Sequence, residues 1–399
     1  MIKKYVYIKK KRLINYSPDD GSIIILLTII AIAFVNSNLD ILYEAITTFK
    51  LFEIKSINLE INTLYIVNEI LMSVFFLNIG IEIKKEFLYG SLQTKSQMIL
   101  PILSAIGGFI FPMIIYYLFN YDDDDAMYGI AIPSATDIAF TMAVVLFFRK
   151  RIPISIRVFV MALAVVDDIM AIIVIAFKYN NGISYIFIFA SIIVILFIYL
   201  LKFSKKQKIS SYILLGILLW IFIELSGIHA TISGVILGLI IPTHKNRKRN
   251  KENNVEDRDI AEIINLYIEK PVNRVILPLF AFFNAGMKLD CTSYILEPIT
   301  LGIALGLLFG KPIGIFLTFL ILMRLNLVEM PYQGTYGKMF AASCFCGIGF
   351  TMSIFMSTLS FDIDSDLFLM SKLGIILGSS ASIILGTISI VCTKKNINI

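Results

Sequence analysis

Charged residues, histidine and cysteine are all scarce in this sequence, and each scarcity excludes a class of protein. Charged residues make up 16% of the 399 residues, whereas a soluble domain carries roughly 25%. A disordered chain needs low hydrophobicity, and 58% of these residues are hydrophobic. Four cysteines exclude a disulfide scaffold, and two histidines argue against a multi-histidine metal centre or a haem stack. What remains is a polytopic membrane protein.

Long apolar runs, by contrast, are abundant. A spanning helix needs roughly 20 mostly apolar residues, and open sheets cannot cross lipid because their edges stay unpaired. Twelve stretches qualify: 21–38, 63–81, 99–119, 126–148, 157–177, 184–201, 210–226, 228–241, 273–287, 299–322, 339–360 and 370–391. The sequence therefore predicts one all-α integral membrane domain, 1–399, with twelve transmembrane helices.

Lysine and arginine predict the orientation, because they favour the cytoplasmic side in short loops. If the basic tail 1–20 is inside, 29 of the 35 basic residues fall on that side and five on the other. Both termini and the charged loop 242–272 are then cytoplasmic. The stretch 39–62 is outside, and its alternating apolar residues predict a strand or hairpin rather than a helix. The first apolar run is expected to remain as a helix rather than to be cleaved as a secretory signal.

Two adjacent aspartates, Asp167 and Asp168, interrupt an apolar run that would otherwise be an ordinary membrane helix. Ionisable groups inside a span are costly and mark functional sites. Two carboxylates in a medium of low dielectric constant cannot both stay ionised without a cation or protons. That property suits a site that alternates between a small cation and protons. The alternative is an acid pair that only joins helices, which is a poor source of stability.

Lys311 lies deep in another apolar run and is the only basic residue expected inside a span, when basic residues at the span ends are counted with the loops. An intramembrane lysine is expected to pair with a carboxylate, and Asp167 or Asp168 is the economical partner. A buried lysine also loses its proton readily, so Lys311 is a candidate for proton exchange. A purely structural ion pair is the alternative, and the sequence does not separate the two.

The span 126–148 has the signs of a broken helix. Pro133 removes a backbone donor in mid-span, and Thr136 and Asp137 follow as polar neighbours for the freed backbone groups. Broken helices at membrane depth are tolerated only beside protein or a wet cavity. Half-helices leave partial positive charge at N-termini and negative charge at C-termini. Asp137 is therefore well placed to neutralise N-terminal ends, and Lys311 to neutralise C-terminal ends.

A matching break is predicted at 346–355, where Gly347 and Gly349 weaken a second helix. Both breaks are followed by Phe-Thr-Met, at 140–142 and 350–352. Paired interrupted spans in two halves of a chain indicate a transporter binding site built from inverted repeats. Spans 3–5 and spans 10–12 begin on opposite sides of the membrane, as inverted repeats require.

Seven stretches, in this order along the chain, resemble the bacterial NhaA family of sodium/proton antiporters: 68–86, 131–142, 161–177, 226–242, 276–286, 310–314 and 346–355. The resemblance implies two broken helices that cross near the membrane midplane. It also implies an electrogenic secondary transporter, not an enzyme, that exports Na⁺ or Li⁺ in exchange for protons. Such a protein lies in the bacterial inner membrane, serves sodium and pH homeostasis, and needs no cofactor and no nucleic acid.

The resemblance implies roles for single residues. Asp167 and Asp168 are similar to the pair that binds Na⁺ or Li⁺ and exchanges it for protons, and Lys311 is similar to the lysine that pairs with the first aspartate. The positions at the crossing of the broken helices are Pro133, Thr136, Asp137, Gly347 and Gly349. The positions linked to a pH response are Glu82, Lys84, Lys85, Glu86 and His229. The family forms homodimers in the lipid bilayer partly through an outer hairpin, for which 39–62 is the candidate.

The sequence departs from the family pattern at two places. Glu69 stands where an aspartate is expected, which keeps the charge and lengthens its reach. The stretch 243–262 is unusually basic and rich in asparagine, so Glu262 is the only suggestion for a pH-sensing acid there. His229 also has a plainer interpretation as a helix-packing residue.

Other function classes fit the sequence less well. A channel favours rings of carbonyls or repeated charges along a pore, whereas one acid pair and one lysine suit a carrier. Another monovalent cation/proton carrier, or a cation channel, is kept as the alternative. A membrane metalloenzyme is disfavoured, because the sequence has no HExxH motif and because Cys344 and Cys346 have no nearby cysteines to complete a zinc site.

Overall fold

The structure, a computed structural model, describes residues 18–54, 59–89, 95–178, 184–203, 208–243, 259–288 and 291–393. Among these residues, six helical stretches are long and apolar enough to cross a membrane: Thr63–Leu88, Met98–Asn120, Ala126–Phe147, Ile154–Ala176, Pro298–Arg324 and Asp366–Cys392. Two bent pairs raise the number to as many as eight, namely Gly21–Val35 with Asp40–Thr47 and Tyr336–Cys346 with Phe350–Ser360. The prediction of a helical, multi-pass membrane protein is confirmed. Most of the predicted cytoplasmic tail, 1–17, and residues 244–258 of the predicted loop lie outside the described residues.

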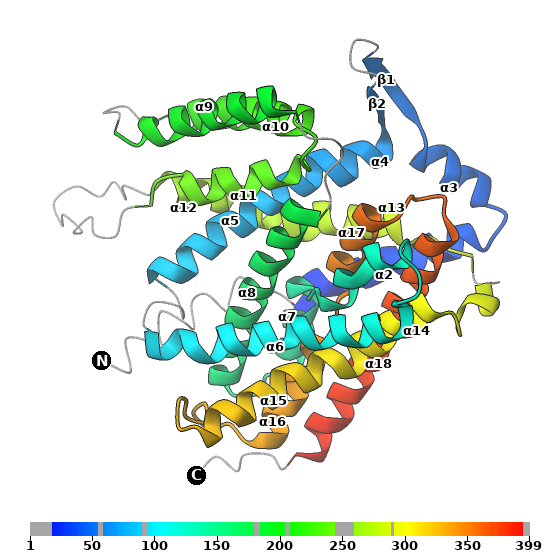
Figure 1. Ribbon diagram of the computed structural model, residues 1–399, viewed down its shortest axis with the longest axis vertical. Helices are drawn as coiled ribbons and strands as arrows, with labels where there is room; N and C mark the ends of the chain where they lie inside the picture. The colour runs from blue at the N-terminus through cyan, green and yellow to red at the C-terminus, as the bar shows by residue number, and fades with distance from the viewer. Residues whose placement is uncertain are drawn as a thin grey trace. The chain divides into compact units, whose positions relative to one another are not determined.

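The chain divides into two compact units (Figure 1). Unit 1 comprises Met1–Ala45, Ser91–Ala171 and Ala281–Ile399, and unit 2 comprises Ile46–Gly90 and Ile172–Phe280. The helices of unit 1 are α2 (Pro18–Val35), α3 (Asp40–Thr47), α6 (Lys95–Asn120), the 3₁₀ helix η3 (Ala126–Ser134), α7 (Ile138–Phe147), α8 (Ile154–Lys178), the 3₁₀ helix η5 (Cys291–Tyr294), α14 (Pro298–Leu305), the π-helix η6 (Gly306–Gly310), α15 (Lys311–Arg324), α16 (Tyr336–Cys346), α17 (Phe350–Ser360) and α18 (Asp366–Cys392). Helices α3 and α8 enter unit 2 at their C-terminal ends.

The elements of unit 2 are β1 (Lys50–Ile54), β2 (Leu59–Asn62), α4 (Thr63–Tyr65), the π-helix η2 (Ile66–Leu71), α5 (Met72–Tyr89), α9 (Tyr185–Leu201), α10 (Ile209–Leu225), α11 (Thr231–Ile240), α12 (Ile260–Pro271), the π-helix η4 (Val272–Ile276) and α13 (Leu277–Ala285), whose last turns belong to unit 1. Helices α9, α10 and α11 fall on three of the predicted spans, but they have only 10–17 residues. This shortness accounts for three of the four predicted spans that are missing from the long apolar helices, and the fourth, 273–287, falls on η4 and α13.

In unit 1, α6 and α15 pack with their backbones in close approach (Figure 1). A Cβ atom at Gly314 would lie 2.3 Å from the carbonyl oxygen of Gly107, and one at Gly107 would lie 2.6 Å from the carbonyl oxygen of Gly314. Small residues are what allow two membrane helices to come this close. Because Gly314 lies one turn from Lys311 on the same helix, this contact also fixes the start of α15.

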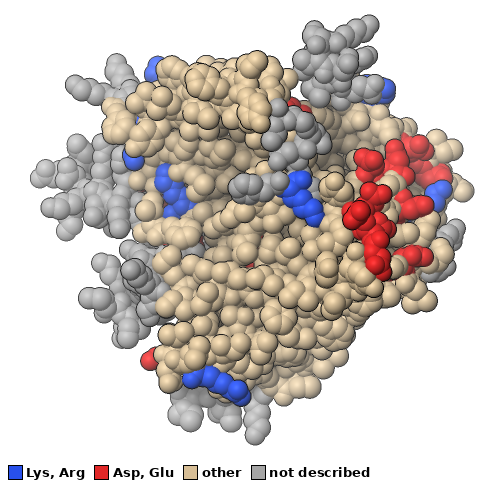
Figure 2. All heavy atoms as spheres, viewed as in Figure 1, with Lys and Arg blue, Asp and Glu red and all other residues tan. Residues whose placement is uncertain are grey.

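Two neighbouring loops of unit 1 carry exposed aspartates. The loop between α6 and η3 holds aspartates 122–125, and the loop between α17 and α18 holds Asp362 and Asp364. The loops are adjacent, because a Cβ atom at Gly129 would lie 2.6 Å from the ring of Phe361. Figure 2 shows acidic side chains gathered in one area of the visible surface. Such a density of exposed charge belongs in water rather than in lipid.

In unit 2, α5 and α11 pack through a Gly-x-x-x-Gly stripe. A Cβ atom at Gly234 would lie 2.2 Å from the carbonyl oxygen of Ser73, and one at Gly238 would lie 2.7 Å from that of Leu77. Backbone-to-backbone contact of this kind stabilises membrane helix pairs, because lipid supplies no hydrophobic drive between them.

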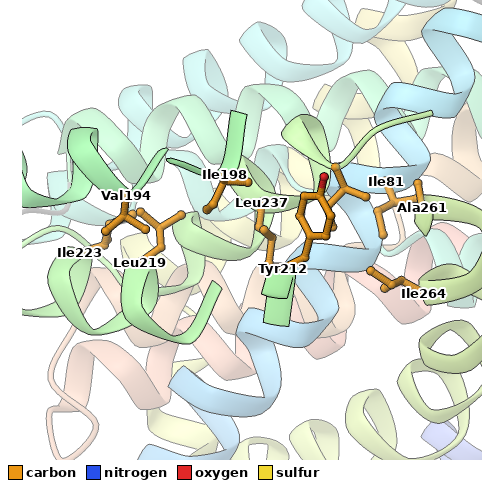
Figure 3. Close-up of a cluster of buried hydrophobic side chains, with 10 residues drawn as sticks. Ile81, Val194, Ile198, Tyr212, Leu219, Ile223, Leu237, Ala261 and Ile264 are labelled. Carbon is orange, nitrogen blue, oxygen red and sulfur yellow. The ribbon is translucent and has the colours of Figure 1, made fainter. Parts of the chain in front are cut away.

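A buried apolar cluster joins five helices of unit 2 (Figure 3). Side chains of α5, α9, α10 and α11 point toward one another, with two residues of α12 beside them. The cluster comprises Ile81, Val194, Ile198, Tyr212, Leu219, Ile223, Leu237, Ile241, Ala261 and Ile264. Leu196 and Leu214, on the other faces of α9 and α10, are 55% and 69% exposed. The short helices therefore have one packed face and one face suited to lipid.

The stretch 39–62 combines a helix with a hairpin. Strands β1 and β2 pair antiparallel, with Phe52 opposite Ile61 and Ile54 opposite Leu59. The alternation in the sequence predicted a strand or hairpin here. It did not predict α3, which occupies the first part of the stretch.

Candidate functional site

Two helix breaks in unit 1 lie against each other. Pro133 is inside η3, and the chain then runs extended through residues 135–137 before α7 begins. Helix α16 ends at Cys346, Gly347 and Gly349 lie in the break, and α17 is bent by 40° relative to α16. The Asp137 N–H donates to the carbonyl oxygen of Ile348 at 2.8 Å. The two broken helices predicted from the sequence are therefore in direct contact.

Equivalent residues of the two breaks also meet through their side chains. The rings of Phe140 and Phe350, from the two Phe-Thr-Met triplets, have centroids 5.7 Å apart. The hydroxyl of Thr141 donates to the carbonyl oxygen of Phe345 at 3.1 Å, near the C-terminus of α16. The hydroxyl of Thr351, in the second triplet, donates to Asp137 at 2.5 Å.

Asp137 accepts hydrogen bonds at the N-termini of both half-helices. Its Oδ1 accepts from the Phe140 N–H at 2.9 Å and so caps α7. Its Oδ2 accepts from the N–H and the hydroxyl of Thr351, at 3.2 and 2.5 Å, at the start of α17. The residue is 1% exposed. One buried carboxylate thus faces the positive ends of two helix dipoles, which stabilise its charge where water is absent.

Lys311 forms an ion pair with Asp167, one of the two partners that the sequence left open. Its Nζ lies 3.0 Å from Asp167 Oδ2, and neither side chain is exposed to solvent. Nζ also donates to the carbonyl oxygen of Ser134, the last residue of η3. The π-helix η6 ends immediately before Lys311, which is the first residue of α15. The lysine charge therefore lies against a carboxylate and the negative end of a half-helix.

Thr136 links Asp167 to the second break. Its hydroxyl lies 2.7 Å from Asp167 Oδ2 and 3.1 Å from the carbonyl oxygen of Cys346. Because a hydroxyl has one hydrogen, it can donate to only one of these oxygens at a time. Asp167 Oδ1, by contrast, is buried and has no hydrogen-bond partner among the described residues.

Asp168 follows Asp167 on α8 and is 2% exposed. Among the described residues, no group of three or more His, Cys, Asp and Glu side chains could hold a metal ion. A resident metal centre needs such a set of ligands. Two buried carboxylates with a hydroxyl and backbone carbonyls nearby suit a cation that binds and leaves again.

The residues predicted for a pH response lie in unit 2 and do not form one cluster. Lys84 Nζ donates to the carbonyl oxygen of Ile241 at 2.5 Å, just past the end of α11. Glu86 is buried, and Glu82 is half-buried on the same helix. His229 Nδ1 lies 3.8 Å from Glu69 Oε1. Positions 69 and 84 are 15 residues of helix apart, and each residue rises about 1.5 Å. The Glu69–His229 contact and the Lys84 contact therefore lie at opposite ends of one span.

The comparison with known proteins decides the family. Residues 11–390 match the family described as Na⁺/H⁺ antiporter 1. The chain belongs to this family. A Na⁺/H⁺ antiporter NhaA of Proteus mirabilis is 35% identical over 380 residues, which cover 94% of this chain and 95% of that protein. The Escherichia coli NhaA is 37% identical over 381 residues (94% and 96%), and the Rhizobium etli NhaA is 39% identical over 328 residues (82% and 83%). The predicted Na⁺/H⁺ antiport is therefore confirmed, as is the prediction that the chain is a transporter and not an enzyme.

One sequence expectation about this antiporter family member is wrong. Lys311 is not the only basic residue inside a span, because Lys372 lies in α18 and Lys338 in α16, and both are buried. Lys372 Nζ donates to the carbonyl oxygen of Gly286 at 3.0 Å, beyond the C-terminus of α13, and lies 4.4 Å from the ring centre of Phe368. The count of basic residues assigned Lys338 to the inner loop before 339–360 and Lys372, at the start of 370–391, to the outer loop, because a residue near the end of an apolar stretch is not seen to be buried from the sequence alone.

Glu224, on α10, has a hydrogen-bond partner far away along the chain. Tyr65 donates its hydroxyl to Glu224 Oε1 at 2.8 Å. Glu69 Oε2 is buried and has no hydrogen-bond partner among the described residues. Only the long separation along the chain, 159 residues between Tyr65 and Glu224, hid this pair from the sequence.

Proposed function

We propose that this Na⁺/H⁺ exchange exports Na⁺, or Li⁺ in its place, and that Asp167 and Asp168 carry both the cation and the protons. The observation that carries the proposal is the fully buried Lys311–Asp167 ion pair beside a second buried aspartate at two crossing helix breaks. Membership of the Na⁺/H⁺ antiporter 1 family supports the same reaction.

The exchange follows from competition for one carboxylate pair. In an inward-open state, Na⁺ binds Asp168 and Asp167 and displaces their protons. In an outward-open state, Na⁺ leaves and the carboxylates take up protons again. Because the two ions cannot be held together, the pair couples the two fluxes. If more than one proton moves for each Na⁺, the exchange is electrogenic and responds to the membrane potential.

The breaks supply the electrostatic frame for this exchange. Asp137 offsets the two positive N-terminal ends, and Lys311 offsets a negative C-terminal end. Oppositely charged ends of half-helices in the membrane are a known way to build an ion site without a resident metal. In this proposal Asp137 and Lys311 hold the frame, while Asp167 and Asp168 bind the transported ions.

We also propose the finer architecture of twelve spans with inverted repeats, with the broken helices crossing near the midplane. The contact between Phe140 and Phe350 supports the repeat, because equivalent residues are expected to meet at a two-fold axis. We place the protein in the bacterial inner membrane with both termini inside, as the basic residues favour. Homodimers would form through the β1–β2 hairpin.

The regulatory assignments are proposals as well. Glu82, Lys84, Glu86 and His229 are proposed to adjust activity to pH. The contact of Lys84, on α5, with the residue just past α11 supports this, as does the contact between Glu69, on η2, and His229, in the connection between α10 and α11.

Everted membrane vesicles with a pH-sensitive dye test the function. We expect Na⁺ and Li⁺ to release protons from acid-loaded vesicles and K⁺ to have no effect. A response to K⁺ alone would favour the alternative, a different cation/proton carrier. Cation flow without proton movement would favour a channel. A membrane potential imposed with valinomycin and K⁺ should change the exchange rate if transport is electrogenic.

A further inference from the structure

Helix α17 begins in the break without a cap of its own. Its N-cap residue is Gly349, which has no side chain to accept a hydrogen bond. The first N–H groups of a helix have no partner within that helix, and burying them unpaired is costly. Helix α7 differs, because its own N-cap residue, Asp137, accepts from Phe140. The start of α17 must therefore be capped by other elements.

Helix α18 supplies the missing acceptor. Ser379 Oγ lies 3.3 Å from the N–H of Gly349 and 3.3 Å from the N–H of Phe350. The next N–H, of Thr351, goes to Asp137. Ser379 is 4% exposed, so water does not replace it easily. The N–H groups at the start of α17 are therefore bonded to two side chains, the hydroxyl of Ser379 and the carboxylate of Asp137.

One turn further along α18, Ser382 contacts η6, the segment that precedes Lys311. Its hydroxyl donates to the carbonyl oxygen of Leu307 at 3.2 Å. Leu307 lies in the π-helix η6, which ends immediately before Lys311. A π-helix disturbs the regular hydrogen-bond ladder, and such segments are frequent at functional sites. Ser382 has no exposed surface.

We propose that Ser379 and Ser382 are positioning residues for the antiport site, acting through α17 and η6. Ser379 fixes the start of α17, which leaves Asp137 free to cap both half-helices. Ser382 fixes η6 and with it the approach of Lys311 to Asp167. Among the described residues, neither serine forms a hydrogen bond with Asp167 or Asp168. The inference rests on the proposed Na⁺/H⁺ exchange, which it refines.

The test combines transport and amide exchange in the full-length protein. With Ser379→Ala, the apparent KM for Na⁺ should rise about fivefold, the effect of losing one buried hydrogen bond, while the maximal rate changes less. Hydrogen–deuterium exchange of the amides at 349–351 should become faster in purified protein. Ser379→Thr keeps the hydroxyl and should restore both values in large part. Ser382→Ala should raise the KM with no effect on those amides.

Ser380→Ala is the matched control, because this neighbouring serine of α18 is exposed. Wild-type KM and amide exchange in Ser379→Ala would overturn the proposal, as would an equal effect of Ser380→Ala. If Ser379→Ala does not reach the membrane, the KM for Na⁺ and the amide exchange of Ser379→Thr and Ser382→Ala are measured instead, and those values decide whether the proposal stands. Failure of the wild-type protein to move protons with Na⁺ would instead reject the proposed exchange, and the amide measurement would still report whether Ser379 caps α17.

Discussion

At the scale of single residues, burial and pairing decide what each charge can do. Lys311 and Asp167 have no exposed surface, and Asp167 keeps one buried oxygen without a partner among the described residues. An isolated buried charge is far more costly than a paired one. The site is therefore stable only while a lysine, a cation or a proton compensates its carboxylates.

We expect Asp168→Asn to abolish Na⁺-dependent proton movement in everted vesicles. An amide cannot lose a proton in exchange for Na⁺, so the two fluxes lose their coupling. Asp364→Asn, which changes an exposed loop aspartate, is the control and should leave exchange unchanged. Normal exchange by Asp168→Asn would remove this residue from the site.

Lys311→Gln should both slow exchange and destabilise the protein. Removing one partner of a buried ion pair leaves the other charge uncompensated, at a cost of roughly 3–5 kcal/mol. Thermal unfolding in detergent measures the stability, and the response of the rate to an imposed membrane potential measures electrogenicity. A variant that is less stable but still electrogenic would show that Lys311 has only a structural role.

At the scale of elements, the half-helices depend on caps that come from distant parts of the chain. Asp137 accepts from Phe140 three residues away and from Thr351 214 residues away. This double cap gives the N–H of Phe140, at the start of α7, and the N–H of Thr351, at the start of α17, an acceptor inside the membrane.

Asp137→Ala should be more harmful than Asp137→Asn. Asparagine keeps an oxygen for the capping bonds but loses the charge, whereas alanine leaves the N–H groups of Phe140 and Thr351 without an acceptor. An unsatisfied buried donor costs about 1–3 kcal/mol. Thermal stability in detergent should fall in the order wild type, Asn, Ala. Equal stability of the two variants would show that charge, not capping, is what this position provides.

Helix packing gives a second prediction at this scale. Gly234→Ala should destabilise unit 2, because its Cβ would lie 2.2 Å from the backbone oxygen of Ser73, which cannot move alone. Gly216→Ala is the matched control, because its Cβ would meet only the end of the flexible Leu237 side chain. We expect a lower melting temperature for the first variant and little change for the second. The reverse order would show that α5 and α11 are not closely packed.

At the scale of the whole molecule, the distribution of charge predicts the topology. Exposed aspartates lie in the loops predicted outside, and the residues predicted inside are rich in lysine and arginine. The positive-inside tendency acts on short loops such as these.

Labelling of single cysteines tests that topology in a variant whose four native cysteines are serine. A membrane-impermeant maleimide should label Asp124→Cys in intact cells and Lys150→Cys only in everted vesicles. Both positions are exposed in the protein. A cysteine that is not labelled therefore lies on the side of the membrane that the reagent does not reach. Labelling of both from the same side would contradict the predicted orientation.

The sequence by itself determined the class of protein, the helix breaks and which charges lie inside apolar runs, because few charges occur in such runs and because proline and glycine interrupt helices locally. It did not determine that Lys311 meets Asp167, that Asp137 caps two helices, or that Lys372, Ser379 and Ser382 are buried. Those facts depend on how helices rotate and pack across separations such as the 214 residues between Asp137 and Thr351. Local pattern fixes where a helix ends, and only tertiary packing decides which side chain reaches that end.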